Sequence, residues 1–169
     1  MLCSSFYCRN VFNIGWHTCY CDIAGWEVIM SISNSELIAL AIEARKNAYA
    51  PYSKFKVGAA LLTRDGSIVK GCNIEGASYT PTNCAERTAF FKAISDGITQ
   101  FEKIAIVGGK EEETDRFSSY AYPCGVCRQV MREFCSSDFE IIVGKSIDEY
   151  EVYTLEELLP KGFGPENLA

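Results

Sequence analysis

Two short segments carry the side chains best suited to bind a metal and move a proton. They are Cys84-Ala85-Glu86 and Pro123-Cys124-Gly125-Val126-Cys127. Cysteine thiolates are zinc ligands, and two cysteines separated by two residues can reach one ion. A site with three protein ligands leaves one position open for water, as catalytic zinc sites do. The spacing therefore predicts one Zn²⁺ per chain, held by Cys84, Cys124 and Cys127.

Glu86 lies two residues after Cys84, close enough to reach a water on the metal without being a ligand itself. A carboxylate in that position can take a proton from the water and return it to a substrate. Three thiolates carry more negative charge than Zn²⁺ offsets, so a compensating group is expected. Arg87 is predicted to donate a hydrogen bond to a ligand sulfur, and Gln129 to another.

Each of these residues also has a simpler interpretation. Cys124 and Cys127 fit a structural zinc pair or a redox pair. Glu86 fits the common acidic residue in the first turn of a helix, and Arg87 and Gln129 fit exposed helical positions. The Cys84-x-Glu86 pattern favours the catalytic interpretation, because a structural zinc site needs no carboxylate two residues from a ligand.

Both motifs stand at the start of a predicted helix, where free N–H groups and the positive end of the helix dipole favour thiolates. These helices cover residues 83–95 and 124–134. Capping boxes begin two further helices, at Ser33 with Glu36 and at Thr154 with Glu157, which are predicted to end at Pro51 and at Pro160. Strands are predicted over residues 55–63, 67–75, 101–107, 139–143 and 151–153. Strands that alternate with helices indicate an α/β layered domain.

Composition narrows the class of partner. The chain has 169 residues and a net charge of -6, which disfavours nucleic acid. It has no apolar run of about 20 residues, so no membrane partner is expected. Nine cysteines, an odd number, cannot all pair in internal disulfides. We therefore expect free thiols and a cytoplasmic location.

The amino-terminal segment differs from the rest. Residues 1–33 are expected to be an extension of unknown role, with Met30 as an alternative start, and residues 34–169 to be the catalytic domain. The single histidine, His17, lies near Cys19 and Cys21. No fourth ligand is evident there, so no second zinc site is predicted.

The pattern Cys-x-Glu followed by Pro-Cys-x-x-Cys resembles the zinc nucleobase deaminases. Further segments are similar to the homotetrameric cytidine deaminases, over about residues 35–168. They are Pro51-Tyr52-Ser53-Lys54-Phe55, Val57-Gly58-Ala59-Ala60, Asn73-Ile74-Glu75, Cys84-Ala85-Glu86-Arg87-Thr88-Ala89, Cys127-Arg128-Gln129 and Glu156-Glu157-Leu158-Leu159-Pro160 with Phe163. The loop 110–122 looks longer than in compact members.

The resemblance implies a three-layer α/β/α sandwich with a mixed, roughly five-stranded sheet. It implies hydrolytic deamination of cytidine and 2'-deoxycytidine to uridine and 2'-deoxyuridine in pyrimidine salvage. Zinc-activated hydroxide would attack C4, with Glu86 as the proton shuttle. Phe55 and Ala85 would contact the base, and Asn73 and Glu75 the ribose.

The resemblance also implies a homotetramer whose active sites are shared between subunits. Ala77, Tyr79 and Phe163 match the positions that complete a neighbouring site. From the pattern alone, Asn73 and Glu75 fit a polar strand end, and Phe55, Tyr79 and Phe163 fit ordinary packing aromatics.

Two other functions compete. One is a deaminase acting on an antibiotic nucleoside or a polynucleotide; Asn73-x-Glu75 favours a free sugar instead. The other is a non-enzymatic zinc module that binds a partner protein. Glu86 argues against that module, because a pseudoenzyme would typically lose this residue.

Overall fold

The computed structural model describes residues 32–168, so His17, Cys19, Cys21, Met30 and nearly all of the expected extension lie outside the described residues. Five strands form one sheet with the order β2-β1-β3-β4-β5. They are β1 (Phe55–Thr63), β2 (Ile68–Cys72), β3 (Phe101–Lys110), β4 (Glu140–Gly144) and β5 (Tyr150–Thr154). Only β3 and β4 pair in parallel, so the sheet is mixed, as predicted.

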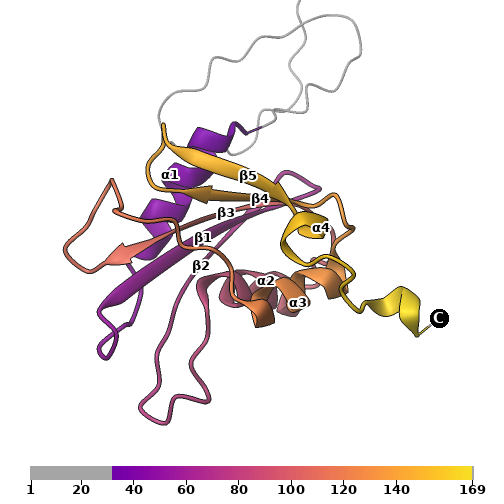
Figure 1. The fold of residues 1–169 in the computed structure, drawn as a ribbon, viewed down its shortest axis with the longest axis horizontal. Helices are drawn as coiled ribbons and strands as arrows, with labels where there is room; N and C mark the ends of the chain where they lie inside the picture. The colour runs from indigo at the N-terminus through magenta and orange to yellow at the C-terminus, as the bar shows by residue number, and fades with distance from the viewer. Residues whose placement is uncertain (1–31, 169) are drawn as a thin grey trace, which may run out of the picture.

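Helices cover both faces of this sheet (Figure 1). They are α1 (Asn34–Arg45), α2 (Ala85–Ser95), α3 (Gly125–Phe134) and the short α4 (Leu155–Leu158), followed by a 3₁₀ turn, η1 (Pro165–Asn167). Alternate residues of β1 enter two separate cores: Leu61 packs with α2 and α3, and Leu62 packs with α1. A strand whose side chains alternate between two apolar layers is buried on both faces. The predicted three-layer sandwich is confirmed.

Both predicted capping boxes are present, at Ser33 with Glu36 and at Thr154 with Glu157. The prediction that the first helix continues to Pro51 was wrong, because α1 ends at Arg45. The chain turns at Lys46 and Asn47, and Tyr49 beyond them forms a bridge to Ile74. This pairing between distant segments prevents the helix from continuing beyond Arg45, although Ala48 still fits the helical repeat of apolar residues.

The helix α2 lies unusually close to the edge strand β2. A Cβ atom at Gly71 would come within 2.3 Å of the Ala85 carbonyl oxygen and 2.5 Å of the Ala89 nitrogen. Only glycine permits this approach. Gly71 therefore fixes the amino-terminal end of α2, which carries Cys84 and Glu86, against the sheet. No helix among residues 32–168 is long and apolar enough to cross a membrane.

Candidate metal and nucleoside site

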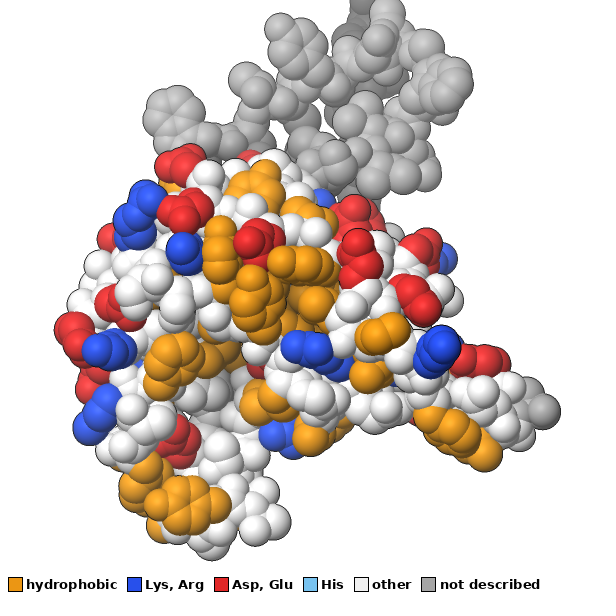
Figure 2. All heavy atoms as spheres, in the orientation of Figure 1, with side chains coloured by type: hydrophobic (Ala, Val, Ile, Leu, Met, Phe, Trp, Pro, Cys, Tyr) orange, Lys and Arg blue, Asp and Glu red, His pale blue; other side chains and the backbone are white. Residues whose placement is uncertain are grey.

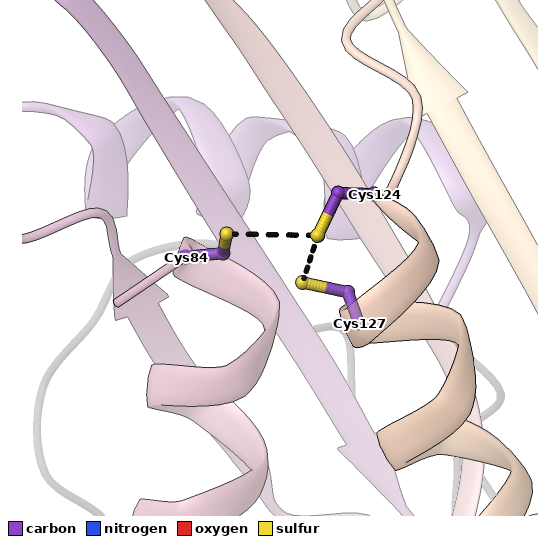
Figure 3. A group of neighbouring side chains, drawn as sticks. All are labelled: Cys84, Cys124 and Cys127. Atoms are coloured by element: carbon purple, nitrogen blue, oxygen red, sulfur yellow. Dashed lines mark hydrogen bonds between the residues drawn. The ribbon is translucent and has the colours of Figure 1, made fainter. Parts of the chain in front are cut away.

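The two predicted motifs meet at the amino-terminal ends of α2 and α3. Cys84 is the N-cap residue of α2, and Cys124 is the N-cap residue of α3. Neither N-cap side chain caps its own helix. Figure 3 shows the thiols of Cys84, Cys124 and Cys127 turned toward one another across the gap between the two helices. Both helix dipoles thus point their positive ends at the same cluster.

The spacing of the three sulfurs fits a zinc ion. The Cys84 and Cys124 sulfurs are 3.9 Å apart, and those of Cys124 and Cys127 are 3.4 Å apart. All three lie within 4.8 Å of one another. Tetrahedral zinc with Zn–S bonds of about 2.3 Å separates its sulfur ligands by about 3.8 Å. The donor set and its geometry therefore match one Zn²⁺ per chain.

Arg87 supplies the positive charge expected beside the thiols. Its Nη2 donates to the Cys84 sulfur at 3.6 Å and to the Thr82 carbonyl at 3.3 Å, while its buried Nε has no partner among the described residues. The hydrogen bond from Cys127 and then that from Arg87 lower the pKa of Cys84 to about 5. The same contact with Cys84, together with burial, raises the pKa of Cys127. Because zinc binds thiolates, metal binding must displace the proton from Cys127, the thiol whose pKa is raised.

Glu86 lies in the first turn of α2 and is 4 % exposed. Burial raises the pKa of its carboxyl to about 7, and the nearby Cys84 adds to this effect. A carboxyl with a pKa near neutrality can both accept and return a proton. The structure therefore places a group suited to proton transfer directly beside the thiol cluster.

A pocket of about 220 Å³ opens in front of these groups. Its lining includes the predicted residues Phe55, Asn73, Cys84, Ala85, Glu86 and Cys124, together with Val57, Thr82, Asn83, Ala121 and Tyr122. The Asn73 side chain accepts from the Val57 backbone at 2.8 Å and donates to the Phe55 carbonyl at 2.9 Å. Each of its polar atoms retains capacity for a further bond.

Glu75 does not line this pocket. Its carboxylate accepts from the backbone N–H groups of Tyr52 and Ser53 at 3.0 and 3.2 Å, and also from the Ser53 hydroxyl. These hydrogen bonds, of which the one from the Ser53 hydroxyl has the largest effect, lower the pKa of the Glu75 carboxyl. Glu75 and Tyr79 line a second hollow of about 350 Å³, which adjoins the first because Thr82 lines both.

The remaining predicted residues lie on the outside of the described chain. Ala77 is exposed, Tyr79 is 74 % exposed with a positive φ of 60°, and Phe163 is 59 % exposed. Gln129 does not donate to a sulfur as predicted: its amide nitrogen donates to the Phe163 carbonyl at 2.8 Å. Gln129 thus occupies an exposed helical position, which was its simpler interpretation, and its hydrogen bond links α3 to the carboxyl-terminal segment.

Several contributors were not singled out from the sequence. Thr82, Asn83, Ala121 and Tyr122 come from loops, whose conformation no periodicity predicts. Arg128 donates to the Pro123 carbonyl at 2.7 Å and to the Leu158 carbonyl at 2.7 Å, which holds the turn before Cys124 against α4. Its place in the motif Cys127-Arg128-Gln129 was the one indication from the sequence that Arg128 matters.

Comparison with known proteins gives a consistent result. Residues 31–143 match a protein-family model described as the cytidine and deoxycytidylate deaminase zinc-binding region. A cytidine deaminase of Sporosarcina psychrophila is 48 % identical over 134 residues, covering 79 % of this chain and 93 % of that protein. One of Halalkalibacterium halodurans is 48 % identical over 132 residues, covering 78 % and 95 %.

The fold gives the same assignment. The crystal structure of a cytidine deaminase from Burkholderia pseudomallei superposes with a TM-score of 0.70 and 43 % sequence identity, covering 78 % of this chain and all of that one. The family model, the sequence identities and the fold all indicate a zinc-dependent deaminase, which agrees with the cluster of three cysteines described above. The chain belongs to the cytidine and deoxycytidylate deaminase family.

Proposed function

We propose that this chain catalyses the hydrolytic deamination of cytidine and 2'-deoxycytidine to uridine and 2'-deoxyuridine, with release of ammonia, in pyrimidine salvage. The observation that carries the proposal is the buried Glu86 carboxyl beside three thiols at the inner end of a pocket of about 220 Å³. A pocket of this size suits a single pyrimidine base. Family membership supports the same reaction.

Cys84, Cys124 and Cys127 hold the zinc ion in this proposal. Bound there, zinc would supply the Lewis-acid activation of water that attack at C4 of the base requires. Arg87 keeps the thiolate charge partly neutralised through its contact with the Cys84 sulfur. Without such compensation, three thiolates weaken the effect of the metal on water.

Glu86 moves the protons of the reaction. Its carboxylate takes one proton from the attacking water and delivers it to N3 of the base, where it stays. It then takes the second proton from the hydroxyl added at C4 and delivers it to the amine, so that the C4–N bond breaks, the C4 carbonyl forms and ammonia leaves. A pKa of about 7 lets the same group serve in both directions. The Ala85 backbone, directly before Glu86, contacts the edge of the base, and the Phe55 ring packs against it.

The sugar is held by Asn73 and Glu75, which leave the β2 strand end toward the two adjoining hollows. Asn73 has one donor and one acceptor position left for a ribose hydroxyl. Glu75 already binds the loop at Ser53, so it acts both on the sugar and on the segment that carries Phe55. The nucleoside, rather than a polynucleotide, is the substrate class that this small site and the net charge of -6 favour.

A homotetramer with shared active sites completes this proposal. Tyr79 and Phe163 are large, exposed aromatic side chains, and Phe91 and Val126 on α2 and α3 are 47 % and 58 % exposed around an open apolar hollow of about 540 Å³. Apolar surfaces of this kind are typical of subunit interfaces. Ala77, Tyr79 and Phe163 would then close the site of a neighbouring subunit. We place this catalytic domain over residues 34–169 and the enzyme in the cytoplasm, where its free thiols stay reduced.

The test is direct conversion. Purified protein is incubated with cytidine and 2'-deoxycytidine while the loss of cytosine absorbance is followed, and zinc is measured on the same sample. Turnover with about one zinc per chain is the expected result. Full zinc loading without turnover of either nucleoside would overturn the proposed substrate, and a wider panel of aminopyrimidine nucleosides would then identify another.

A further inference from the structure

Three tyrosines and one carboxylate form a cluster beside the pocket that the proposed reaction does not use. The hydroxyls of Tyr122 and Tyr153 both donate to Oε2 of Glu151, at 2.5 and 2.7 Å. The Tyr122 ring lies 5.9 Å from that of Tyr120 and 6.0 Å from that of Tyr153. Two hydroxyl donors on one ionised oxygen make charge-assisted bonds, which are stronger than those between neutral groups.

Glu151 reaches Tyr122 from the edge strand of the sheet. In the β4–β5 pairing, Glu151 lies opposite Val143 and Tyr153 lies opposite Ile141. Val143 and Ile141 belong to the core that contains α2 and α3. Glu151 and Tyr153 therefore occupy the face of β5 on the site side of the sheet. Orange side chains, a class that includes tyrosine, gather near the middle of the view in Figure 2. Glu151 is half-buried on this face of β5, and both tyrosine hydroxyls donate to its carboxylate.

Tyr122 connects this cluster to the pocket. It lines the pocket and lies two residues before Cys124. Its neighbour Ala121 packs closely over the sheet, since a Cβ atom at Gly108 would come within 2.7 Å of the Ala121 Cβ. The Ala121-Tyr122 wall is thus fixed from beneath by β3 and from outside by Glu151.

The chemistry of the base determines which of its edges meets this wall. Glu86 must reach N3 and the amine on C4, so the N3 edge of the ring faces the segment that contains Ala85 and Glu86. The opposite edge, C5 and C6, then faces lining outside that segment, which includes Val57, Ala121 and Tyr122; of these, Tyr122 lies two residues before the ligand Cys124. A substituent on C5 would meet the wall.

We propose that Glu151 is a positioning residue that holds Tyr122 as the wall of the nucleoside pocket, and that this wall discriminates against substituents on C5 of the pyrimidine. The proposal deepens the function proposed above and rests on it. Loss of the Glu151 anchor would loosen the wall without touching the zinc ligands or Glu86.

The experiment compares cytidine with 5-methylcytidine in the wild type, Glu151→Ala, Glu151→Gln and Tyr122→Phe. We expect Glu151→Ala and Tyr122→Phe to raise KM for cytidine about three- to tenfold, the loss expected for one ordinary hydrogen bond at a partly exposed position, with kcat and zinc content nearly unchanged. The wild-type preference for cytidine over 5-methylcytidine, about tenfold or more for one methyl group in a tight pocket, should fall in both variants.

Three features separate positioning from a general structural effect. Glu151→Gln keeps an acceptor oxygen and should recover part of the preference. The double variant Tyr122→Phe with Glu151→Ala should be no worse than either single variant, because both remove the same bond. Tyr150→Phe and Glu140→Gln change a tyrosine and a carboxylate elsewhere on β5 and β4 and should leave the preference intact. An unchanged preference in Glu151→Ala, or full additivity in the double variant, would overturn the proposal.

Calorimetric binding of uridine and 5-methyluridine tests the wall without turnover. If the wild type binds both nucleosides but does not deaminate cytidine, the proposed function fails. The ratio of the Kd values for uridine and 5-methyluridine still measures how strongly the Ala121-Tyr122 wall discriminates against a methyl group on C5. An unchanged ratio in Glu151→Ala overturns the positioning role alone. A wild type that binds neither nucleoside overturns both proposals.

Discussion

The inner and outer ends of the site differ in how much of their structure one chain supplies. At the inner end, Glu86 and Cys127 are 4 % and 1 % exposed, and every group with a proposed chemical role comes from the first turns of α2 and α3. Tyr79, which lines the adjoining outer hollow, and Phe163, which lines neither hollow, are 74 % and 59 % exposed. The reactive groups are therefore assembled within a single chain, whereas the rim has aromatic surface that the chain itself does not cover.

This difference follows from what each end needs. A buried metal and proton shuttle depend on fixed distances, which two helices packed on one sheet provide. Burial also raises the pKa of Glu86. The rim must admit a substrate, and Glu75, Tyr79 and Thr82 of the outer hollow come from irregular segments of the chain rather than from helices or strands. The comparison predicts that changes at the inner end abolish chemistry and that changes at the rim alter binding and assembly.

The largest effect is expected from Cys124→Ala. It removes one of three zinc ligands, so zinc and activity should both be lost, and the melting temperature should fall because metal binding contributes to folding. Cys135→Ala is the matched control: Cys135 lies at the other end of α3, outside the cluster, and this variant should retain zinc. Metal analysis with thermal denaturation checks both variants. Full zinc content in Cys124→Ala would remove it from the ligand set.

Glu86→Ala should separate metal binding from proton transfer. We expect kcat to fall by about 10² to 10⁴, the usual contribution of a general acid–base group, with zinc content nearly unchanged. The isosteric Glu86→Gln should behave alike, because an amide cannot carry the proton. Steady-state kinetics and metal analysis on the same samples provide the check. Zinc loss in both variants would contradict the role assigned to Glu86.

Arg87→Gln should have an intermediate effect. It removes the cation beside the Cys84 sulfur, so the thiolate charge is less compensated and kcat should fall about 10- to 100-fold, as for other groups that support metal ligands. Arg87→Lys keeps the charge and should lose less activity. Equal rates for Arg87→Gln and the wild type would exclude Arg87 from the mechanism.

The smallest effect is expected at the rim. Phe163→Ala should raise KM about fivefold, the value of one aromatic contact, while kcat per zinc-loaded site stays close to that of the wild type. If Phe163 closes a neighbouring site, the variant should also lose activity on dilution, in parallel with tetramer dissociation followed by light scattering. Leu168→Ala, also an exposed apolar residue, is the control. If the Phe163→Ala enzyme had the wild-type KM at all protein concentrations, Phe163 would have no role in a shared site.

Much of this protein was accessible from local sequence. The capping boxes at Ser33 and Thr154 depend on neighbouring residues and were observed as predicted, as was the order of strands and helices. Two strand ends differ most from the prediction: β2 ends at Cys72 rather than at residue 75, and β3 continues past residue 107 to Lys110. The three cysteines could be assigned to one site because Cys124 and Cys127 are locally spaced and Cys84 adjoins a carboxylate. The same local rules placed α1 too far toward Pro51, because the pairing of Tyr49 with Ile74 is a contact between distant segments.

Sequence by itself determined the kinds of groups present and their spacing along the chain: thiols, a carboxylate and an arginine at the starts of two helices. Tertiary structure decided which of them share a space. It brought Cys84 within 3.9 Å of Cys124, turned Gln129 toward Phe163, and placed Glu151 of the edge strand on Tyr122. The physical reason is that side-chain chemistry and helix capping act over a few residues, whereas burial and partner choice depend on how the sheet, helices and loops pack.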